Sequence, residues 1–139
     1  MIIRFAMLLF FCCAAQASAD KFYSLTGNLM ANNQLLLTYD IDKCCYLYKR
    51  SLSFNLLESK AAISKLTFPG AIRHNDEFFG DVEVYRGQVA ITLELDLSQT
   101  EGRVDGLKLK ANQQGCSDEG ICFLPDETIL TFSFLPGLN

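Results

Sequence analysis

Residues 89–97 read VAITLELDL, and every second residue of this stretch is apolar. Ile91, Leu93 and Leu95 alternate with the polar Thr92 and Glu94. Apolar residues with a period of two are the pattern of a β-strand that buries one face. The chain shows no comparable repeat near 3.6 residues, the period that an amphipathic helix requires. The stretch therefore predicts an all-β protein.

Further β-rich runs lie on both sides of this strand, and they predict the rest of the sheet structure. They are residues 34–42, 44–57, 62–68, 82–85, 107–111 and 130–134. The tripeptide Arg86-Gly87-Gln88 predicts a hairpin that joins two of these runs. Residues 57–65 could add at most one helical turn. Roughly seven short strands in a chain of this size are typical of an immunoglobulin-like antiparallel β-sandwich.

The N-terminus has the pattern of a secretory signal peptide. Arg4 gives a positive start, residues 5–15 are apolar, and Ala17-Ser18-Ala19 resembles a cleavage site. We therefore expect residues 1–19 to be removed and residues 20–139 to form one exported domain, located in the periplasm. The net charge of −4, or −5 once Arg4 is removed, argues against nucleic-acid binding and against attraction to an anionic membrane. The mature domain is not expected to insert into a membrane.

The cysteine pattern points to a disulfide. Of the six cysteines, Cys12 and Cys13 lie in the predicted signal peptide. The other four allow three pairings. Cys116 and Cys122 are separated by five residues that include Gly120, which suits a hairpin whose two arms hold the cysteines across from each other. From spacing alone this bond could be a structural link or a reversible redox pair.

Three sequence blocks resemble one known family. Residues 114–125, QGCSDEGICFLP, are similar to the active-site segment of the N-terminal periplasmic domain of the thiol:disulfide interchange protein DsbD. Residues 46–50, YLYKR, resemble that family's tyrosine-containing strand. Residues 74–80, HNDEFFG, followed by 83–86, EVYR, resemble its cap loop and the strand after it. The blocks occur in the family's order and cover nearly all of the expected mature chain.

The resemblance implies a role for each part of the site. Cys116 and Cys122 would be the catalytic pair, with Cys122 forming mixed disulfides with partners and Cys116 resolving them. Tyr46 and Tyr48 would line the site. A cap loop would shield it, with Phe78 over the cysteines; its residues are Asp76, Glu77, Phe78, Phe79 and Gly80. The domain would serve as a component of a protein-disulfide reductase that receives electrons and passes them to thioredoxin-fold partners, without a cofactor.

The carboxylates near the cysteines suggest how such a dithiol would behave. Asp118 and Glu119 lie within the cysteine loop, and Asp76 and Glu77 would lie near it in the cap loop. Negative charge disfavours a thiolate. We therefore expect the free dithiol to react slowly until a partner displaces the cap.

Several residues admit other interpretations. Cys44 and Cys45 depart from the family pattern; we expect one buried and one partly exposed thiol, with a vicinal disulfide or an accessory redox role for Cys44 as alternatives. His74 is the only histidine and is expected in a solvated loop, so neither a metal site nor a Ser/His/Asp hydrolase is indicated. The alternative function is an exported binding or adaptor domain whose disulfide is only structural.

Overall fold

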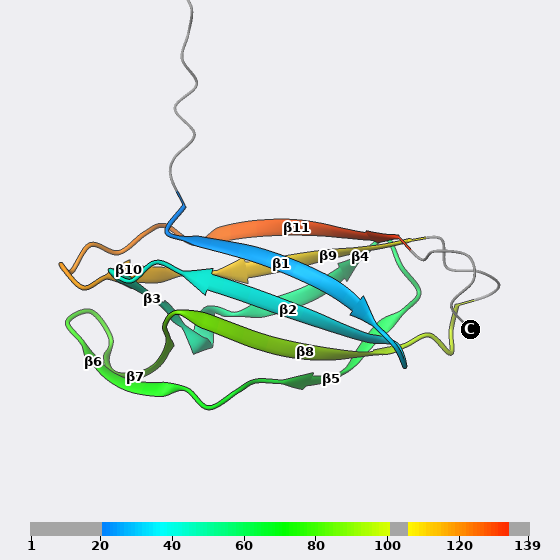
Figure 1. The fold of residues 1–139 in the computed structure, drawn as a ribbon, viewed down its shortest axis with the longest axis horizontal. Helices are drawn as coiled ribbons and strands as arrows, with labels where there is room; N and C mark the ends of the chain where they lie inside the picture. Colours follow the sequence, from blue (N-terminus) through cyan, green and yellow to red (C-terminus); the bar gives the residue numbers. More distant parts are fainter. Residues whose placement is uncertain (1–20, 101–105, 134–139) are drawn as a thin grey trace, which may run out of the picture.

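The computed structural model describes residues 21–100 and 106–133, and these form an antiparallel β-sandwich. The predicted signal peptide lies outside the described residues. The first sheet has the order β1-β2-β8-β5, and a second sheet has the order β11-β9-β4. A third sheet, β10-β3-β7-β6, lies at one end of the molecule, on the left in Figure 1.

The bounds of the strands follow the sequence pattern only in part. The first sheet contains β1 (Tyr23–Met30), β2 (Gln34–Ile41), β5 (Ala62–Thr67) and β8 (Gln88–Asp96). The second contains β4 (Ser53–Leu57), β9 (Gly106–Gln113) and β11 (Asp126–Ser133). The third contains β3 (Cys45–Tyr48), β6 (Ile72–Asp76), β7 (Gly80–Tyr85) and β10 (Gly115–Ser117).

The main core lies between the first two sheets. Strand β8 buries Val89, Ile91, Leu93 and Leu95, as its alternation predicts, and β2 buries the facing residues of the same sheet. Leu107 and Leu109 of β9 reach the core from the opposite sheet. Each fully buried leucine or isoleucine contributes about 1.5–3 kcal/mol by leaving water. This shared apolar core holds the two sheets together and supports the third.

Three local predictions were wrong. The expected hairpin at residues 86–88 does not form, because β7 pairs with β3 and β6 whereas β8 pairs with β2 and β5. The chain passes between sheets there, and Gly87, with a φ of +62°, makes the corner. The single run expected over residues 44–57 is divided into β3 and β4 by a 3₁₀ turn, η1 (Lys49–Ser51). Residues 57–65 contain no helical turn; they end β4 and begin β5.

Strand β3 connects the core with the end of the molecule where the candidate site lies. All four of its residues are buried, because both of its faces are covered. Cys45 and Leu47 belong to the main core, while Tyr46 and Tyr48 pack with Val84 and Cys116 in a second, smaller cluster. The alternation of side chains along a strand thus places two tyrosines against the cysteine hairpin.

Candidate functional site

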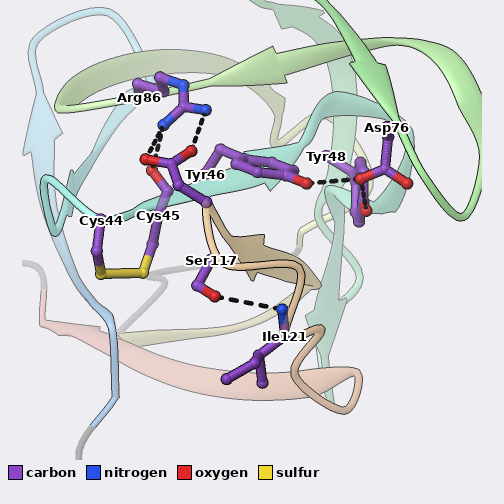
Figure 2. Close-up of polar contacts among 9 residues, drawn as sticks. Cys44, Cys45, Tyr46, Tyr48, Asp76, Arg86, Ser117 and Ile121 are labelled. Atoms are coloured by element: carbon purple, nitrogen blue, oxygen red, sulfur yellow. Dashed lines mark hydrogen bonds and ion pairs between the residues drawn. A yellow bond between two sulfur atoms is a disulfide. The ribbon is translucent and has the colours of Figure 1, made fainter.

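The cysteine hairpin is tight and antiparallel. Cys116 and Cys122 face each other across an isolated β-bridge and form a disulfide, which confirms the geometric prediction from their spacing. The turn between them is closed by the Ser117 N–H, which donates to the Ile121 carbonyl oxygen at 2.8 Å. The Ile121 N–H in turn donates to Ser117 Oγ at 3.3 Å (Figure 2). Gly120 supplies the positive φ of +79° that this turn requires.

Strand β10 holds the hairpin firmly against β3. Cys116 lies opposite Tyr46 in the register, and Gly115 lies opposite Leu47. A Cβ atom at Gly115 would collide with the main-chain carbonyl oxygen of Tyr46. The absence of a side chain at this position therefore permits the close approach that places Cys116 within the tyrosine cluster.

Asp76 is the polar centre of the site. Its Oδ2 accepts hydrogen bonds from the hydroxyl groups of Tyr46 and Tyr48, both at 2.6 Å (Figure 2). Its Oδ1 accepts the backbone N–H groups of Phe78 and Phe79 at 2.7 and 2.9 Å. One carboxylate thus fixes both the lining tyrosines and the first turn of the loop between β6 and β7.

These hydrogen bonds determine the charge state of Asp76. The carboxyl group is buried, with an exposed fraction of 4%. Burial by itself would raise the pKa of Asp76, but the hydrogen bonds from Tyr46, Tyr48 and the loop backbone outweigh it and lower the pKa to about 2. Asp76 is therefore ionised at neutral pH although it lies in the interior.

Tyr48 links Asp76 to the disulfide. Its hydroxyl oxygen lies 2.9 Å from Cys116 Sγ and 3.8 Å from Cys122 Sγ. Desolvation, followed by the hydrogen bond to Asp76, raises the pKa of Tyr48 far above its ordinary value, so the phenol keeps its proton. Because that single proton is donated to Asp76, the oxygen is left to act as an acceptor for a Cys116 S–H group in the reduced state.

The two bonded sulfurs differ in access. Cys116 has an exposed fraction of 0%, whereas Cys122 is partly exposed at the edge of the same cluster. An incoming thiolate can therefore reach Cys122 more readily than Cys116.

The loop between β6 and β7 lies at the same end of the molecule as the cysteine hairpin (green and orange in Figure 1). Phe79 packs edge-on against Tyr48 with ring centroids 5.2 Å apart, while Phe78 is 56% exposed. The Glu77 carboxylate lies beside Gly120, where it would meet an added Cβ atom at 2.8 Å. The loop thus contacts both the tyrosine cluster and the turn of the hairpin.

Two arginines that our sequence interpretation gave no role support this arrangement. The Arg50 guanidinium lies 3.7 Å from the centroid of the Phe79 ring. The Arg86 guanidinium lies 4.9 Å from the centroid of the Tyr46 ring. It also forms a bidentate ion pair with Asp118, with Nη2–Oδ1 and Nη1–Oδ2 distances of 2.6 and 3.2 Å. Both residues belong to the sequence blocks quoted above, but only the folded chain shows which aromatic ring each one covers.

The pairing with Arg86 modifies the expected electrostatics. Its hydrogen bond lowers the pKa of Asp118, and its charge offsets the negative charge of that carboxylate. The four carboxylates therefore do not act equally on the cysteines. Asp76, connected through Tyr48, and Glu77, beside the hairpin turn, remain placed to disfavour a thiolate.

Two other expectations need correction. Cys44 and Cys45 do not form two separate thiols but a vicinal disulfide, although the expected burial of one and exposure of the other is confirmed. The bond joins Cys44 to a residue of the main core and lies apart from Tyr48 and Asp76 (Figure 2). His74 is not in a loop: it belongs to β6, and its ring centroid lies 4.6 Å from that of Tyr46.

Within residues 21–100 and 106–133, no cluster of three or more histidine, cysteine or acidic side chains is arranged to hold a metal ion. No helix in the same ranges is long and apolar enough to cross a membrane.

Comparison with known proteins identifies relatives of this chain. Curated thiol:disulfide interchange proteins DsbD from Pectobacterium atrosepticum and Pasteurella multocida are 32% and 36% identical to it, over 73% and 75% of its length. The matched segment spans only 16–17% of those longer proteins.

Two solved structures share the fold. The reduced N-terminal domain of DsbD from Neisseria meningitidis matches with a TM-score of 0.69 and 19% identity, over 81% of this chain and 86% of that one. A complex of the DsbD and PilB N-terminal domains from the same organism matches with a TM-score of 0.63 and 18% identity, covering 78% of this chain and 80% of that one.

The family model described as "Thiol:disulfide interchange protein DsbD, N-terminal" matches residues 16–133, which include all the strands described here. With this match and relatives above 30% identity, the chain belongs to the family of the DsbD N-terminal domain.

Proposed function

We propose that this domain is a periplasmic thiol:disulfide exchange module that relays electrons through Cys116 and Cys122 to thioredoxin-fold partners. The observation that carries the proposal is the unequal access to one disulfide: Cys122 is partly exposed, and Cys116 is fully buried against Tyr48. A bond that is accessible at one sulfur only favours a single direction of attack. The solved complex of a related domain with the PilB N-terminal domain supports a protein as the exchange partner.

Electrons would enter the domain in two steps. A thiolate of a donor dithiol attacks Cys122 Sγ, the bond to Cys116 breaks, and Cys116 leaves with the electron pair and takes up a proton. The donor's second thiolate then attacks the sulfur of the donor's first cysteine in the mixed disulfide and releases Cys122. The donor ends as a disulfide, and the domain gains two electrons and two protons as two thiols.

Delivery to an acceptor reverses these roles. The Cys122 thiolate attacks the acceptor disulfide and forms a mixed disulfide. Cys116 then loses its proton, attacks Cys122 Sγ and releases the reduced acceptor. Before an acceptor arrives, the reduced Cys116 S–H would donate to the Tyr48 oxygen, and the Asp76 charge would disfavour its ionisation. The dithiol would thus resist small oxidants while the loop of residues 76–80 remains in place.

A reversible carrier must keep its fold when its disulfide opens, and we expect this domain to do so. In the chain-entropy model, closing so short a loop stabilises a protein by roughly 2 kcal/mol. A domain of this size typically has about 5–15 kcal/mol of stability. The sandwich and its separate apolar core would therefore persist when the disulfide opens.

Trapping of a mixed disulfide tests the proposal. The partner is a thioredoxin-fold protein that retains only its first active-site cysteine. This cysteine is held in a mixed disulfide with nitrothiobenzoate, which an attacking thiolate displaces. Both test variants also carry Cys44→Ser and Cys45→Ser, so that the exposed Cys44 cannot react. In this background the reduced Cys116→Ser variant should release nitrothiobenzoate and form a covalent complex through Cys122. The matched Cys122→Ser variant should react at least tenfold more slowly, because Cys116 is buried.

Equal reaction of the two variants would contradict the assigned roles. Failure of the folded wild-type domain to be reduced at Cys116–Cys122 by a thioredoxin-fold dithiol would favour the alternative, an exported binding domain with a structural disulfide.

A further inference from the structure

A second disulfide lies outside the proposed site. Cys44 and Cys45 are adjacent in the chain, immediately before and at the first position of β3, and they are bonded to each other. The exchange cycle proposed above uses neither of them.

The two sulfurs of this pair have unequal access. Cys44 is exposed, whereas Cys45 has an exposed fraction of only 1% and packs in the main core. An external thiolate can approach Cys44 but not Cys45. A free Cys45 thiol would suit its apolar surroundings, because an unpaired cysteine behaves as a small buried apolar residue. The site can therefore accommodate both the bonded and the reduced state.

The pair cannot exchange directly with Cys116. Cys45 lies opposite Ser117 in the register of β3 and β10, and Cys116 lies opposite Tyr46. Since successive residues of a strand point to opposite faces, Cys45 and Cys116 lie on opposite faces of this ribbon. They also belong to different apolar clusters. Cys122 faces Cys116 across a β-bridge and packs in the same cluster, so it lies on the Cys116 face as well. We therefore expect an external dithiol to supply the electrons for the second pair.

The backbone of the pair nevertheless contacts the cysteine hairpin. The Asp118 N–H donates to the Cys44 carbonyl oxygen at 2.7 Å. Arg86 Nη1 donates to the Cys45 carbonyl oxygen at 3.5 Å and also binds the Asp118 side chain (Figure 2). A protein that docks on the hairpin to reach Cys122 would therefore lie beside the segment that carries Cys44.

Opening this bond costs the fold little. The stabilisation that a disulfide gives in the chain-entropy model grows with the length of the loop it closes, and adjacent residues close the shortest loop possible. Exposed disulfides are in general the more readily reduced ones. Accessibility at Cys44 and a small structural contribution are both properties of an exchangeable bond.

We propose that Cys44–Cys45 is a second thiol:disulfide exchange site, reduced by a thioredoxin-fold dithiol. The donor thiolate attacks Cys44 Sγ, the bond to Cys45 breaks, and Cys45 leaves with the electron pair and is protonated. The donor's second thiolate then releases Cys44, so that the donor becomes a disulfide and the domain gains two further thiols. The proposal rests on the proposed function only for the chemical class of the donor.

The test uses the Cys116→Ser/Cys122→Ser double variant, which retains only the second pair in the mature domain. The folded variant is incubated with thioredoxin, thioredoxin reductase and NADPH, the reaction is quenched with acid, and free thiols are then counted by mass after alkylation in denaturant, because Cys45 is buried in the folded domain. We expect none before reduction and two afterwards. Two triple variants add either Cys45→Ser or Cys44→Ser to this double variant. The triple variant with Cys45→Ser should trap a mixed disulfide through Cys44, and the one with Cys44→Ser should trap at least tenfold less.

Two results would overturn the proposal: free thiols at both positions before any reductant is added, or two thiols that form only when the reducing system acts on the unfolded protein. Peptide mapping of alkylated wild-type protein gives the same answer if the double variant does not fold. The Cys44→Ser/Cys45→Ser variant, assayed in parallel for reduction of Cys116–Cys122, separates failure of this inference from failure of the proposed function.

Discussion

Replacement of Asp76 by asparagine tests the polar centre of the site. The substitution nearly preserves the shape of the side chain but removes a buried charge that accepts four hydrogen bonds. The amide in Asp76→Asn has one acceptor oxygen and a donor NH₂ group, so it cannot accept from both tyrosine hydroxyls and the loop backbone in the same way. We expect the cap loop and the tyrosine cluster to lose stability together.

The magnitude follows from the pKa of Asp76. It falls from 3.8 to about 2 on folding, and each pKa unit corresponds to about 1.36 kcal/mol, so ionisation of this group contributes about 2.5 kcal/mol to the free energy of unfolding. Because the pKa is lowered in the folded state, this contribution is complete at pH values above 3.8. It is lost progressively as the pH falls from there toward 2.

Chemical denaturation of the oxidised domain between pH 7 and pH 2.5 measures the effect. Asp76→Asn should be less stable than wild type by about 2–3 kcal/mol at neutral pH, and the difference should narrow steadily below pH 4. Asp81→Asn, at an exposed position in β7, is the control and should change stability by less than about 0.5 kcal/mol. A deficit in Asp76→Asn that stays constant down to pH 2.5 would refute the assignment of an ionised, hydrogen-bonded carboxylate.

Three further substitutions probe the hairpin and the cap loop. Gly115→Ala should destabilise the domain by about 2–3 kcal/mol in denaturant, because its Cβ would meet a main-chain carbonyl of β3, whereas Gly70→Ala, in open space, should be near neutral; similar effects at both positions would contradict this. Phe78→Ala should leave the free energy of unfolding within about 0.5 kcal/mol of wild type, because the ring is 56% exposed. It should also speed alkylation of the reduced cysteines, and an unchanged rate would show that Phe78 does not shield them. Arg50→Gln removes the cation from the Phe79 ring, an interaction of about 0.5–1 kcal/mol. It should speed alkylation of the reduced cysteines about two- to fivefold, and Arg50→Lys should partly restore the wild-type rate. Equal rates in wild type and both variants would exclude this contribution.

The cap loop illustrates how far sequence reasoning reached. The resemblance drew attention to residues 76–80 and to the two tyrosines, but it could not place the Asp76 carboxylate between them. The two hydrogen bonds to this carboxylate come from tyrosines that lie 30 and 28 positions before Asp76 in the chain. Likewise, the cation over Phe79 comes from Arg50 in η1; its aromatic neighbour in sequence is Tyr48, and no local pattern reveals that Phe79, in a distant part of the chain, is also its partner.

The alternation of residues 89–97 by itself determined that this chain is built of strands and which side chains of β8 enter the core, because the period of a strand decides which residues share a face. The spacing of Cys116 and Cys122 likewise determined their pairing, since a short antiparallel turn leaves little choice of partner. Only the tertiary structure decided that β7 and β8 enter different sheets and that β3 presents two tyrosines to the cysteines. Strand partners are selected by the burial and hydrogen bonding of segments distant in sequence, and no local pattern contains that information.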